Sequence, residues 1–252
     1  MVMQNVLLFG ISSILIFCCS LFYISYYKQT IFISKNQQIL TPINPANTAF
    51  VFDIHKVFMY QNFSTITLQV VFSRYSIPLL LVSLRPSFWI TFHKITSQSR
   101  VAEYVLRELE TIYPQLAGFP NFFEQLLLEQ KPMYKTVAYI QELKKEGYAL
   151  GILSNCAQET FDKMAKIYPE IFNLFDTAYV PSKQNNYRSK PNPVFFKEGV
   201  LALKKSPHLM HKQFIFIDDK KRNILAGLKE QLVGIHFLSI KQLLADINTL
   251  KK

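Results

Sequence analysis

The sequence predicts an α/β protein with a mostly parallel sheet, and three observations lead to this prediction. From residue 134 onward, short apolar runs that suit buried strands alternate with segments of helical periodicity. Polar residues follow several of these runs directly, as they do at the ligand crevice of open α/β sheets. A long insert separates the first such run from the others. The 252 residues suffice for one core with a sizeable interior plus that insert.

The first element is an apolar segment at the start of the chain. Residues 1–27 contain no Asp, Glu, Lys or Arg, and residues 5–27 are almost entirely apolar. About 20 such residues span a bilayer as a helix, whereas a cleavable signal peptide requires basic residues before the apolar run. Lysines appear only after the run, beginning at Lys28. Because positive charge favours the cytoplasmic side, we expect a single-pass anchor over residues 1–27 and a cytoplasmic domain that carries the net charge of +11.

A linker and the first strand come next. Residues 28–47 are polar and interrupted by proline, which is typical of a tether. Residues 49–52 form a short apolar run that suits a strand buried on both faces. We therefore assign the core to residues 48–57 and 135–252.

The insert, residues 58–134, is predicted to be helical. Apolar residues recur at helical spacing over residues 101–112, and residues 121–130 are predicted to form a second helix. Residues 66–92 are strongly apolar but contain two prolines and two arginines, which argue against a second membrane span. Packing inside a cap and a membrane-facing surface both remain open for this segment.

The remaining elements alternate. We predict strands at residues 148–153, 177–180, 214–217 and 233–237. Helices are predicted to end at Gly147, to surround residues 161–165, and to cover residues 193–203 and about 220–231. A last helix begins at Ser239, which forms a capping-box pattern with Gln242.

Two of the polar segments carry oxygen and amide groups suited to phosphate chemistry. Asp53 follows the first strand, where a carboxylate is either a rigidly placed nucleophile or simply a helix cap. Ser154 and Asn155 follow the strand at 148–153 and offer a hydroxyl and an amide to phosphate oxygens, or cap the next helix.

The other two segments carry charge. Lys190 precedes a Pro-x-Pro turn, and its ammonium suits both a nucleophilic carboxylate and a phosphate. Asp218 and Asp219 follow the strand at 214–217, and neighbouring carboxylates that repel one another require a cation. Mg²⁺ is the natural partner of such a pair.

In order, spacing and flanking residues, the four segments resemble the haloacid dehalogenase superfamily. Asp53, His55 and Val57 occupy the first motif, Asp-x-Asp-x-Val/Thr, and Ser154, Asn155, Lys190, Asp218, Asp219 and Asn223 match the later motifs. The resemblance implies a Rossmann-like, doubly wound core with a helical cap of the C1 type. It also implies a phosphatase that forms an aspartyl-phosphate on Asp53, with Ser154, Asn155 and Lys190 holding the phosphoryl group.

The resemblance further implies a magnesium site formed by Asp53, the backbone carbonyl of His55 and Asp218, with Asp219 completing the site or lying behind it. One departure affects the chemistry: His55 stands where the family has a second Asp, which normally acts as acid and base. An imidazole also exchanges protons near neutral pH, so activity with a different pH profile is expected. Lys56 is a lesser departure, because the family commonly has Gly there.

Three functions are consistent with this pattern. A phosphatase acting on a small phosphorylated substrate accounts for all the matched residues. A membrane-tethered binding protein that keeps the fold without turnover accounts for His55 and Lys56. A dehalogenase accounts for the missing acid but not for the paired Asp218 and Asp219. No nucleic-acid-binding motif is present, and nucleic acid is not an expected partner.

Overall fold

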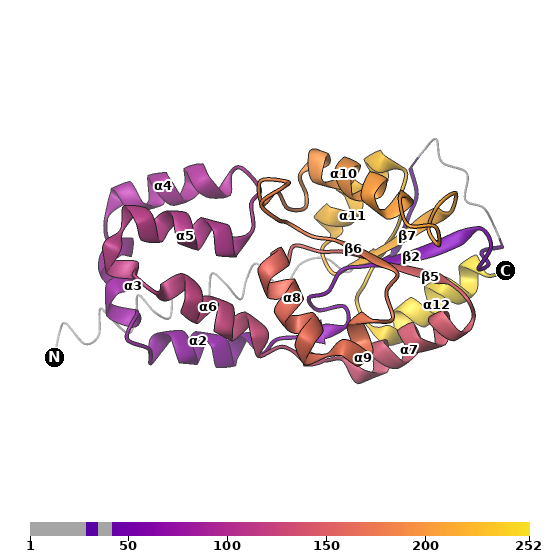
Figure 1. Cartoon of the computed structure of the whole chain (residues 1–252), viewed down its shortest axis with the longest axis horizontal. Coiled ribbons are helices and arrows are strands. Elements are labelled where there is room, and N and C mark those ends of the chain that lie inside the picture. The colour runs from indigo at the N-terminus through magenta and orange to yellow at the C-terminus, as the bar shows by residue number, and fades with distance from the viewer. Residues whose placement is uncertain (1–28, 35–41) are drawn as a thin grey trace. The chain divides into compact units, whose positions relative to one another are not determined.

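A six-stranded sheet forms the centre of the computed structural model, which describes residues 29–34 and 42–252 (Figure 1). The strand order is β1-β8-β7-β2-β5-β6; all neighbours are parallel except β1, which pairs antiparallel with β8. The strands are β1 (Ile31–Phe32), β2 (Thr48–Phe52), β5 (Ala149–Leu153), β6 (Thr177–Tyr179), β7 (Gln213–Asp218) and β8 (Val233–His236). The predicted α/β fold with a mostly parallel sheet is confirmed.

The central strands β2, β5 and β7 are buried on both faces because their side chains alternate between two hydrophobic clusters. In β2, Phe50 and Phe52 belong to one cluster, and Ala49 and Val51 to the other. β7 follows the same period of two, as expected for a strand between two helical layers.

Helices cover both faces of the sheet. Apolar side chains of α7, α8, α9 and α12 join the first cluster, and those of α10 and α11 join the second. Their bounds are α7 (Tyr134–Lys145), α8 (Gln158–Ile167), α9 (Pro169–Phe172), α10 (Pro193–Lys204), α11 (Lys221–Gly227) and α12 (Ile240–Leu250), with a 3-10 turn at Leu228–Glu230.

The chain leaves the central β2 toward β5 and β6 and returns to β7 on its other side. The order therefore reverses between β2 and β7, where ligands bind in such sheets.

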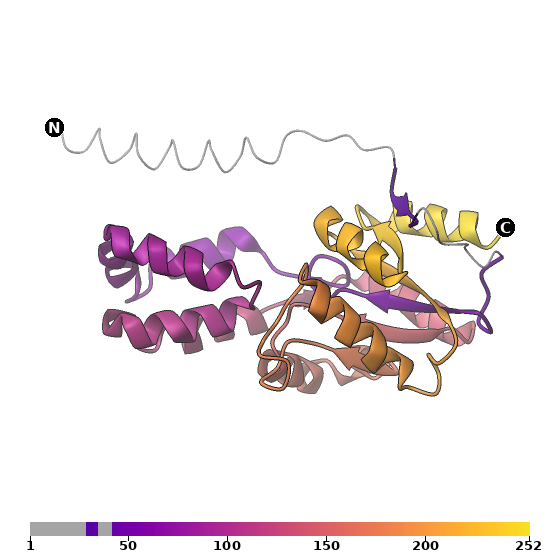
Figure 2. The same ribbon diagram turned by 90° about the horizontal axis from the view of Figure 1, so that it is seen from above.

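The insert forms a helical cap beyond the carboxyl ends of the strands (Figures 1 and 2). It begins and ends in a two-stranded antiparallel ribbon, β3 (Met59–Tyr60) with β4 (Lys131–Pro132). Between them lie α2 (Phe63–Val71), α3 (Ser76–Ser83), α4 (Pro86–Thr96), α5 (Ala102–Ile112), a 3-10 turn at Pro114–Leu116, and α6 (Phe119–Leu128). The cap has its own apolar core, which includes Tyr75, Val82, Phe88 and Leu109.

Several contacts besides the ribbon join the cap to the core, among them the ion pair of Glu124 with Lys163 at 2.8 Å. We call one of them the clasp: residues 99–101 against residues 187–189. The backbone N–H of Val101 donates to the Tyr187 carbonyl at 3.2 Å. The backbone N–H and the hydroxyl of Ser189 both donate to the Ser99 carbonyl, at 2.8 and 2.7 Å. The clasp thus attaches the α4–α5 connection to the loop that leads into Lys190.

Two details differ from the sequence predictions. Ile31 and Phe32 lie within the predicted linker but form β1, because their backbone pairs with Ile235 and Gly234 on the open edge of β8. The Ser239 hydroxyl accepts from the Gln242 backbone N–H as predicted, whereas the Gln242 side chain accepts from the backbone N–H of Leu238 rather than of Ser239.

The predicted transmembrane helix, residues 1–27, lies outside the described residues. Among the residues that are described, no single helix is long and apolar enough to cross a bilayer. One bent pair, Ser64–Val71 with Ser76–Ser83 at 90°, passes that test jointly by length and composition.

Candidate functional site

Asp53 is fixed at the carboxyl end of β2, at the point where the strand order reverses. Its backbone N–H donates to the Ile217 carbonyl at 2.9 Å, which continues the pairing of β2 with β7. Its Oδ1 accepts from the backbone N–H of Ile54 at 2.8 Å and from the Ser154 hydroxyl at 2.6 Å. The carboxylate is buried, so these donors hold it in one orientation.

Lys190 is fully buried between two carboxylates. Its Nζ lies 2.6 Å from Asp218 Oδ2 and 3.1 Å from Asp53 Oδ1, and it donates to the Leu153 carbonyl at 2.7 Å. Burial lowers the pKa of Lys190, but the charges of Asp218 and Asp53 outweigh it and raise the pKa above its ordinary value. The ammonium therefore stays charged at neutral pH and bridges the ends of β2, β5 and β7.

The position of Lys190 depends on Asn155. The Asn155 side chain accepts from the Lys190 backbone N–H at 2.6 Å and donates to the Lys190 carbonyl at 2.9 Å. Both polar atoms of the Asn155 side chain are thus used to hold the lysine backbone. The structure gives this side chain a positioning contact where the sequence analysis expected a phosphate donor.

The two neighbouring acids at the end of β7 have different surroundings. Asp218 Oδ1 accepts from the Lys220 backbone N–H at 2.7 Å, Asn223 Nδ2 lies 3.0 Å from both oxygens, and Lys190 holds Oδ2. In contrast, Asp219 Oδ1 is buried and has no hydrogen-bond partner among the described residues. Both oxygens of Asp218 thus have hydrogen-bond partners, whereas one oxygen of Asp219 is left without one in the described part of the chain.

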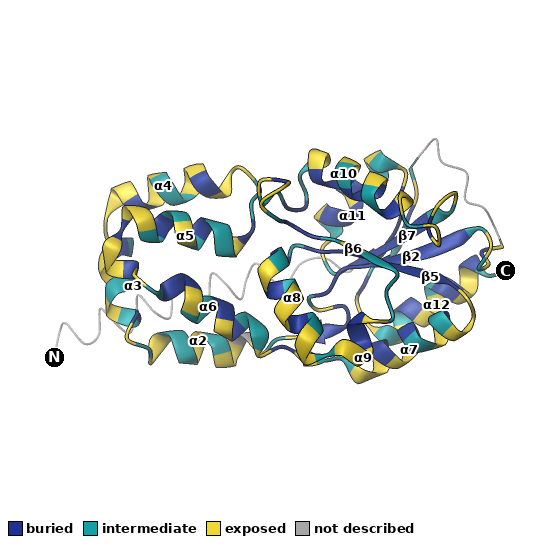
Figure 3. Ribbon diagram, viewed as in Figure 1, coloured by how far each residue is buried: buried dark blue, intermediate teal, exposed yellow. Residues whose placement is uncertain are grey.

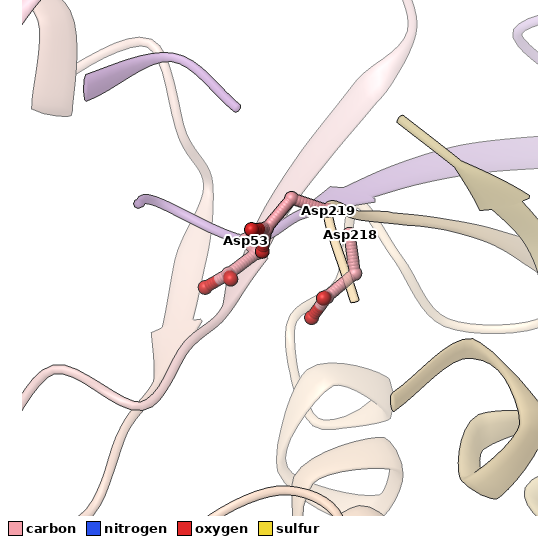
Figure 4. A group of neighbouring side chains, drawn as sticks. All are labelled: Asp53, Asp218 and Asp219. Atoms are coloured by element: carbon pink, nitrogen blue, oxygen red, sulfur yellow. The ribbon is translucent and has the colours of Figure 1, made fainter. Parts of the chain in front are cut away.

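The donor set fits a divalent cation. Carboxylate oxygens of Asp53, Asp218 and Asp219 lie within 4.8 Å of one another (Figure 4). A buried carboxylate oxygen without a partner is costly unless a cation or donor satisfies it, and Mg²⁺ prefers carboxylate ligands. The orphan oxygen of Asp219 next to Asp53 is the feature that such an ion would satisfy.

The carboxylates also differ in their proton affinity. Burial raises the pKa of Asp53, but Lys190, His55 and the hydrogen bonds from Ser154 and the Ile54 N–H together hold it below its ordinary value. Burial and the negative charges of Asp53 and Asp218 raise the pKa of Asp219 to about 6. Asp53 is therefore ionised at neutral pH, whereas burial raises the pKa of Asp218 as well as that of Asp219.

His55 is half-buried, and its Nδ1 points at Gln130, near the C-terminal end of the cap insert. Nδ1 lies 2.6 Å from Gln130 Oε1. The Gln130 Nε2 donates to the Leu127 carbonyl at 2.8 Å, which fixes the orientation of the amide because a carbonyl can only accept. Hence Oε1 accepts from Nδ1–H, and the lone pair of the neutral ring lies on Nε2. Burial lowers the pKa of His55, so the neutral form prevails at pH 7.

The loop after Asp53 contains a backbone conformation that favours glycine. Lys56 has a φ of 61°, in the left-handed region. Its backbone N–H donates to the Met59 carbonyl at 2.8 Å, which closes the turn into β3. This conformation explains why Gly suits the position, and Lys56 adopts it at a steric cost.

The structure brings together the side chains of Asp53, Ser154, Lys190, Asp218 and Asp219, as the sequence analysis expected from the ends of adjacent strands. Sequence reasoning missed Gln130 and the Leu153 carbonyl. Gln130 carries no motif and is 75 residues from His55, and a backbone carbonyl has no residue-type signal at all.

A doubly wound sheet with a cap over the carboxyl ends of its strands and a lysine between two strand-end aspartates defines a capped α/β protein with an acidic site. A family model described as haloacid dehalogenase-like hydrolase matches residues 89–238, more than half of the chain. The chain belongs to this family. The matched range includes Ser154, Lys190, Asp218 and Asp219, whereas Asp53 and His55 precede it.

Curated relatives and solved structures agree with this family. The chain is 27% identical over 154 residues to "Pyrophosphatase PpaX" of Bacillus cereus (strain ATCC 10987 / NRS 248), and the match covers 59% of this chain and 60% of the relative. The chain thus spans about 60% of the length of the curated relatives that it matches.

Two solved structures have the same fold. The putative HAD-hydrolase YfnB from Bacillus subtilis, bound to magnesium, has a TM-score of 0.52 at 14% identity and covers 80% of this chain and 98% of its own. The L-2-haloacid dehalogenase from Xanthobacter autotrophicus has a TM-score of 0.51 at 13% identity and covers 81% and 83%.

Proposed function

We propose that this hydrolase is a magnesium-dependent phosphatase that acts on a small phosphorylated substrate through an aspartyl-phosphate at Asp53. The observation that carries the proposal is the buried, unpartnered Oδ1 of Asp219 close to the carboxylate of Asp53. A dehalogenase has no need for that arrangement, whereas a phosphatase with a bound cation does. The relatives named pyrophosphatase support phosphate chemistry and suggest inorganic pyrophosphate as one substrate to test.

In this proposal the ionised Asp53 attacks phosphorus, and the bond from phosphorus to the leaving oxygen breaks. Lys190 and the Ser154 hydroxyl orient the attacking carboxylate and hold the transferred phosphoryl group. Asn155 acts through Lys190 by fixing its backbone. Water then attacks phosphorus, the bond to Asp53 breaks, and inorganic phosphate leaves.

His55 is the proposed base of the second step. Its Nε2 carries a lone pair because Gln130 holds the proton on Nδ1. The neutral ring accepts the proton of the attacking water at neutral pH. It supplies no proton to a leaving oxygen in that state, so substrates whose leaving groups depart as stable anions, such as aryl phosphates and pyrophosphate, suit this site best.

We assign the cation to Asp53, Asp219 and the backbone carbonyl of His55, with Asp218 serving mainly to hold Lys190. A magnesium ion there supplies positive charge to the phosphoryl oxygens during transfer. The predicted anchor at residues 5–27 and the cytoplasmic location of the domain stay proposals, and the apolar run followed by lysines supports them.

The test measures phosphate release by the full chain from para-nitrophenyl phosphate and from pyrophosphate, with Mg²⁺ or with excess chelator. We expect metal-dependent release that Asp53→Asn reduces at least 1000-fold, roughly the scale of losing a covalent nucleophile. Asp162→Asn, which changes an exposed aspartate on α8, is the matched control and keeps full activity.

Two results would overturn the proposal. Equal inactivity of wild type and Asp53→Asn on both substrates, with phosphate still bound, would favour a binding protein. Chloride release from 2-chloropropionate without added metal would favour a dehalogenase.

A further inference from the structure

The outer end of the cap exposes large apolar side chains of the kind that are normally buried in the core of a protein. α3 and its C-cap residue Leu84 place Ile77, Leu80, Leu81 and Leu84 at spacings i, i+3, i+4 and i+7, and all four are exposed. The opposite side of this helix already packs into the cap through Val82. A helix that is apolar all round is ordinarily buried. Here the four apolar side chains on one side of such a helix are left exposed. Figure 3 shows exposed residues at this end of the cap.

The neighbouring helices extend this face. Phe72 at the end of α2 is 83% exposed, and Trp89 in the first turns of α4 is 55% exposed. We call the outer cap surface the set Phe72, Ile77, Leu80, Leu81, Leu84 and Trp89. In both views of the ribbon, α3 lies at the end of the cap that is remote from the sheet (Figures 1 and 2). The surface is therefore separate from the candidate site and does not serve to cover it.

The segment that carries the outer cap surface is basic, and Glu110 of α5, which accepts from the Gly118 backbone N–H at 2.6 Å close to Arg74, comes from outside this segment. Residues 54–102 contain five Lys or Arg residues and no Asp or Glu. Among them, Arg74 lies between α2 and α3, Arg85 lies between α3 and α4, and Lys94 lies on α4; all three are exposed. A water-soluble protein partner of ordinary composition does not require a segment of this length without acids, whereas an anionic lipid surface attracts each basic group and repels each acidic one.

We propose that the outer cap surface docks on an anionic lipid bilayer, with the face of α3 in the interfacial layer and Arg74, Arg85 and Lys94 against the lipid headgroups. The combination of an apolar helical face, a Trp and flanking basic side chains is that of an interfacial segment. The bent pair formed by α2 and α3 has the apolar composition of a membrane segment, but its 90° bend suits a segment that lies in the interface. The proposal concerns the cap alone and does not depend on the proposed phosphatase activity or on the predicted anchor.

Trp89 provides a direct test because it is the only tryptophan in the chain. Full-length protein is mixed with vesicles of phosphatidylcholine, with or without phosphatidylglycerol, that carry a nitroxide quencher on the acyl chains. We expect quenching and a blue shift of Trp89 emission with the anionic vesicles. A predicted anchor alone would bring the protein to the vesicles without bringing Trp89 to the acyl chains, so co-flotation without quenching would overturn the proposal.

Matched variants separate the apolar from the electrostatic contribution. Leu80→Ser with Leu84→Ser should abolish quenching. Leu201→Ser with Leu238→Ser should not, although these core residues are similarly exposed at 56% and 57%. Arg85→Glu should weaken docking at least about fivefold, the usual effect of one basic group at an anionic surface. Lys241→Glu, an exposed lysine on α12, should leave docking unchanged.

Two further results would contradict lipid docking. Quenching of equal strength in vesicles without phosphatidylglycerol would remove the anionic lipid from the proposal. A concentration-dependent blue shift without vesicles, accompanied by a dimer in sedimentation, would identify a second copy of this chain as the occupant of the outer cap surface.

Discussion

His55 Nδ1 donates to Gln130 Oε1 at 2.6 Å, and this contact joins the loop after the proposed nucleophile to the exit of the cap insert. Gln130 is itself buried, and its backbone carbonyl accepts from the Tyr168 hydroxyl at 2.8 Å. The amide therefore has little freedom, and it imposes one tautomer on the imidazole. In this protein the proton chemistry of the histidine is organised by a residue outside the four sequence motifs.

The first prediction concerns this contact. Gln130→Glu keeps an acceptor for Nδ1–H but adds negative charge, which stabilises the imidazolium and raises the pKa of His55. Because the proposed base must be neutral, the rising limb of the pH profile of kcat should move to higher pH. Gln130→Leu removes the acceptor and should lower kcat about tenfold or more while the profile flattens. An unmoved pH profile in Gln130→Glu would show that the histidine is not the base.

The second prediction concerns the buried Lys190. Lys190→Met leaves the carboxylates of Asp53 and Asp218 buried without their cation, which should lower the free energy of unfolding by about 3–5 kcal/mol. Urea unfolding measures this loss. Lys144→Met, which breaks the partly exposed pair with Asp176, is the comparison and should cost about 1 kcal/mol or less. Adding Asp218→Asn to Lys190→Met should restore part of the stability, since it removes one uncompensated charge.

The third prediction follows from the pKa of Asp219, about 6 in the folded chain against 3.8 for the ordinary group. Between these values the folded state binds more protons than the unfolded state, so stability falls as pH rises from about 4 to about 6 and stays lower above. Metal-free wild type should show this fall in thermal unfolding, and Mg²⁺ should reverse it above pH 6. Asp219→Asn should lessen the fall and lose the response to Mg²⁺. If the variant keeps the magnesium response, Asp219 is not a ligand.

The fourth prediction concerns the turn at Lys56, whose φ is 61°. Lys56→Gly relieves the steric cost of the left-handed conformation and should raise the free energy of unfolding by about 1 kcal/mol. Lys56→Ala removes the same exposed side chain but keeps the Cβ atom, so it should give no such gain. Equal stability of the two variants would mean that the backbone conformation contributes nothing.

The sequence was most informative where a residue's place in a strand decides its surroundings. Asp53, Ser154 and Asp218 each come directly after a buried apolar run, so the parallel order of β2, β5 and β7 is enough to bring them together. The different hydrogen bonding of Asp218 and Asp219 was not predictable in this way. It depends on which of two adjacent side chains turns toward Lys190 and Asn223, and neighbouring residues on a strand point to opposite sides.

Contacts between segments that lie far apart in the chain could not be predicted from the sequence either. β1 is only two residues long, and its pairing with β8 arises because an open strand edge is available, not because Ile31 and Phe32 carry a strand pattern of their own. Gln130 is separated from His55 by the whole cap. Neither contact is marked in the sequence by a periodic pattern or by a characteristic spacing of residues.

The clasp has a consequence for the modularity of the chain. An insert that contacts the core only through the ribbon of β3 and β4 could be replaced by another insert, because both of its connections to the core lie in that ribbon. Here the Ser99 carbonyl also accepts two hydrogen bonds from Ser189, the residue next to Lys190. Replacing residues 63–128 by the insert of a relative would therefore leave the lysine loop without its support. A transplanted insert would therefore have to offer residues 187–189 the same backbone partners as residues 99–101 do here.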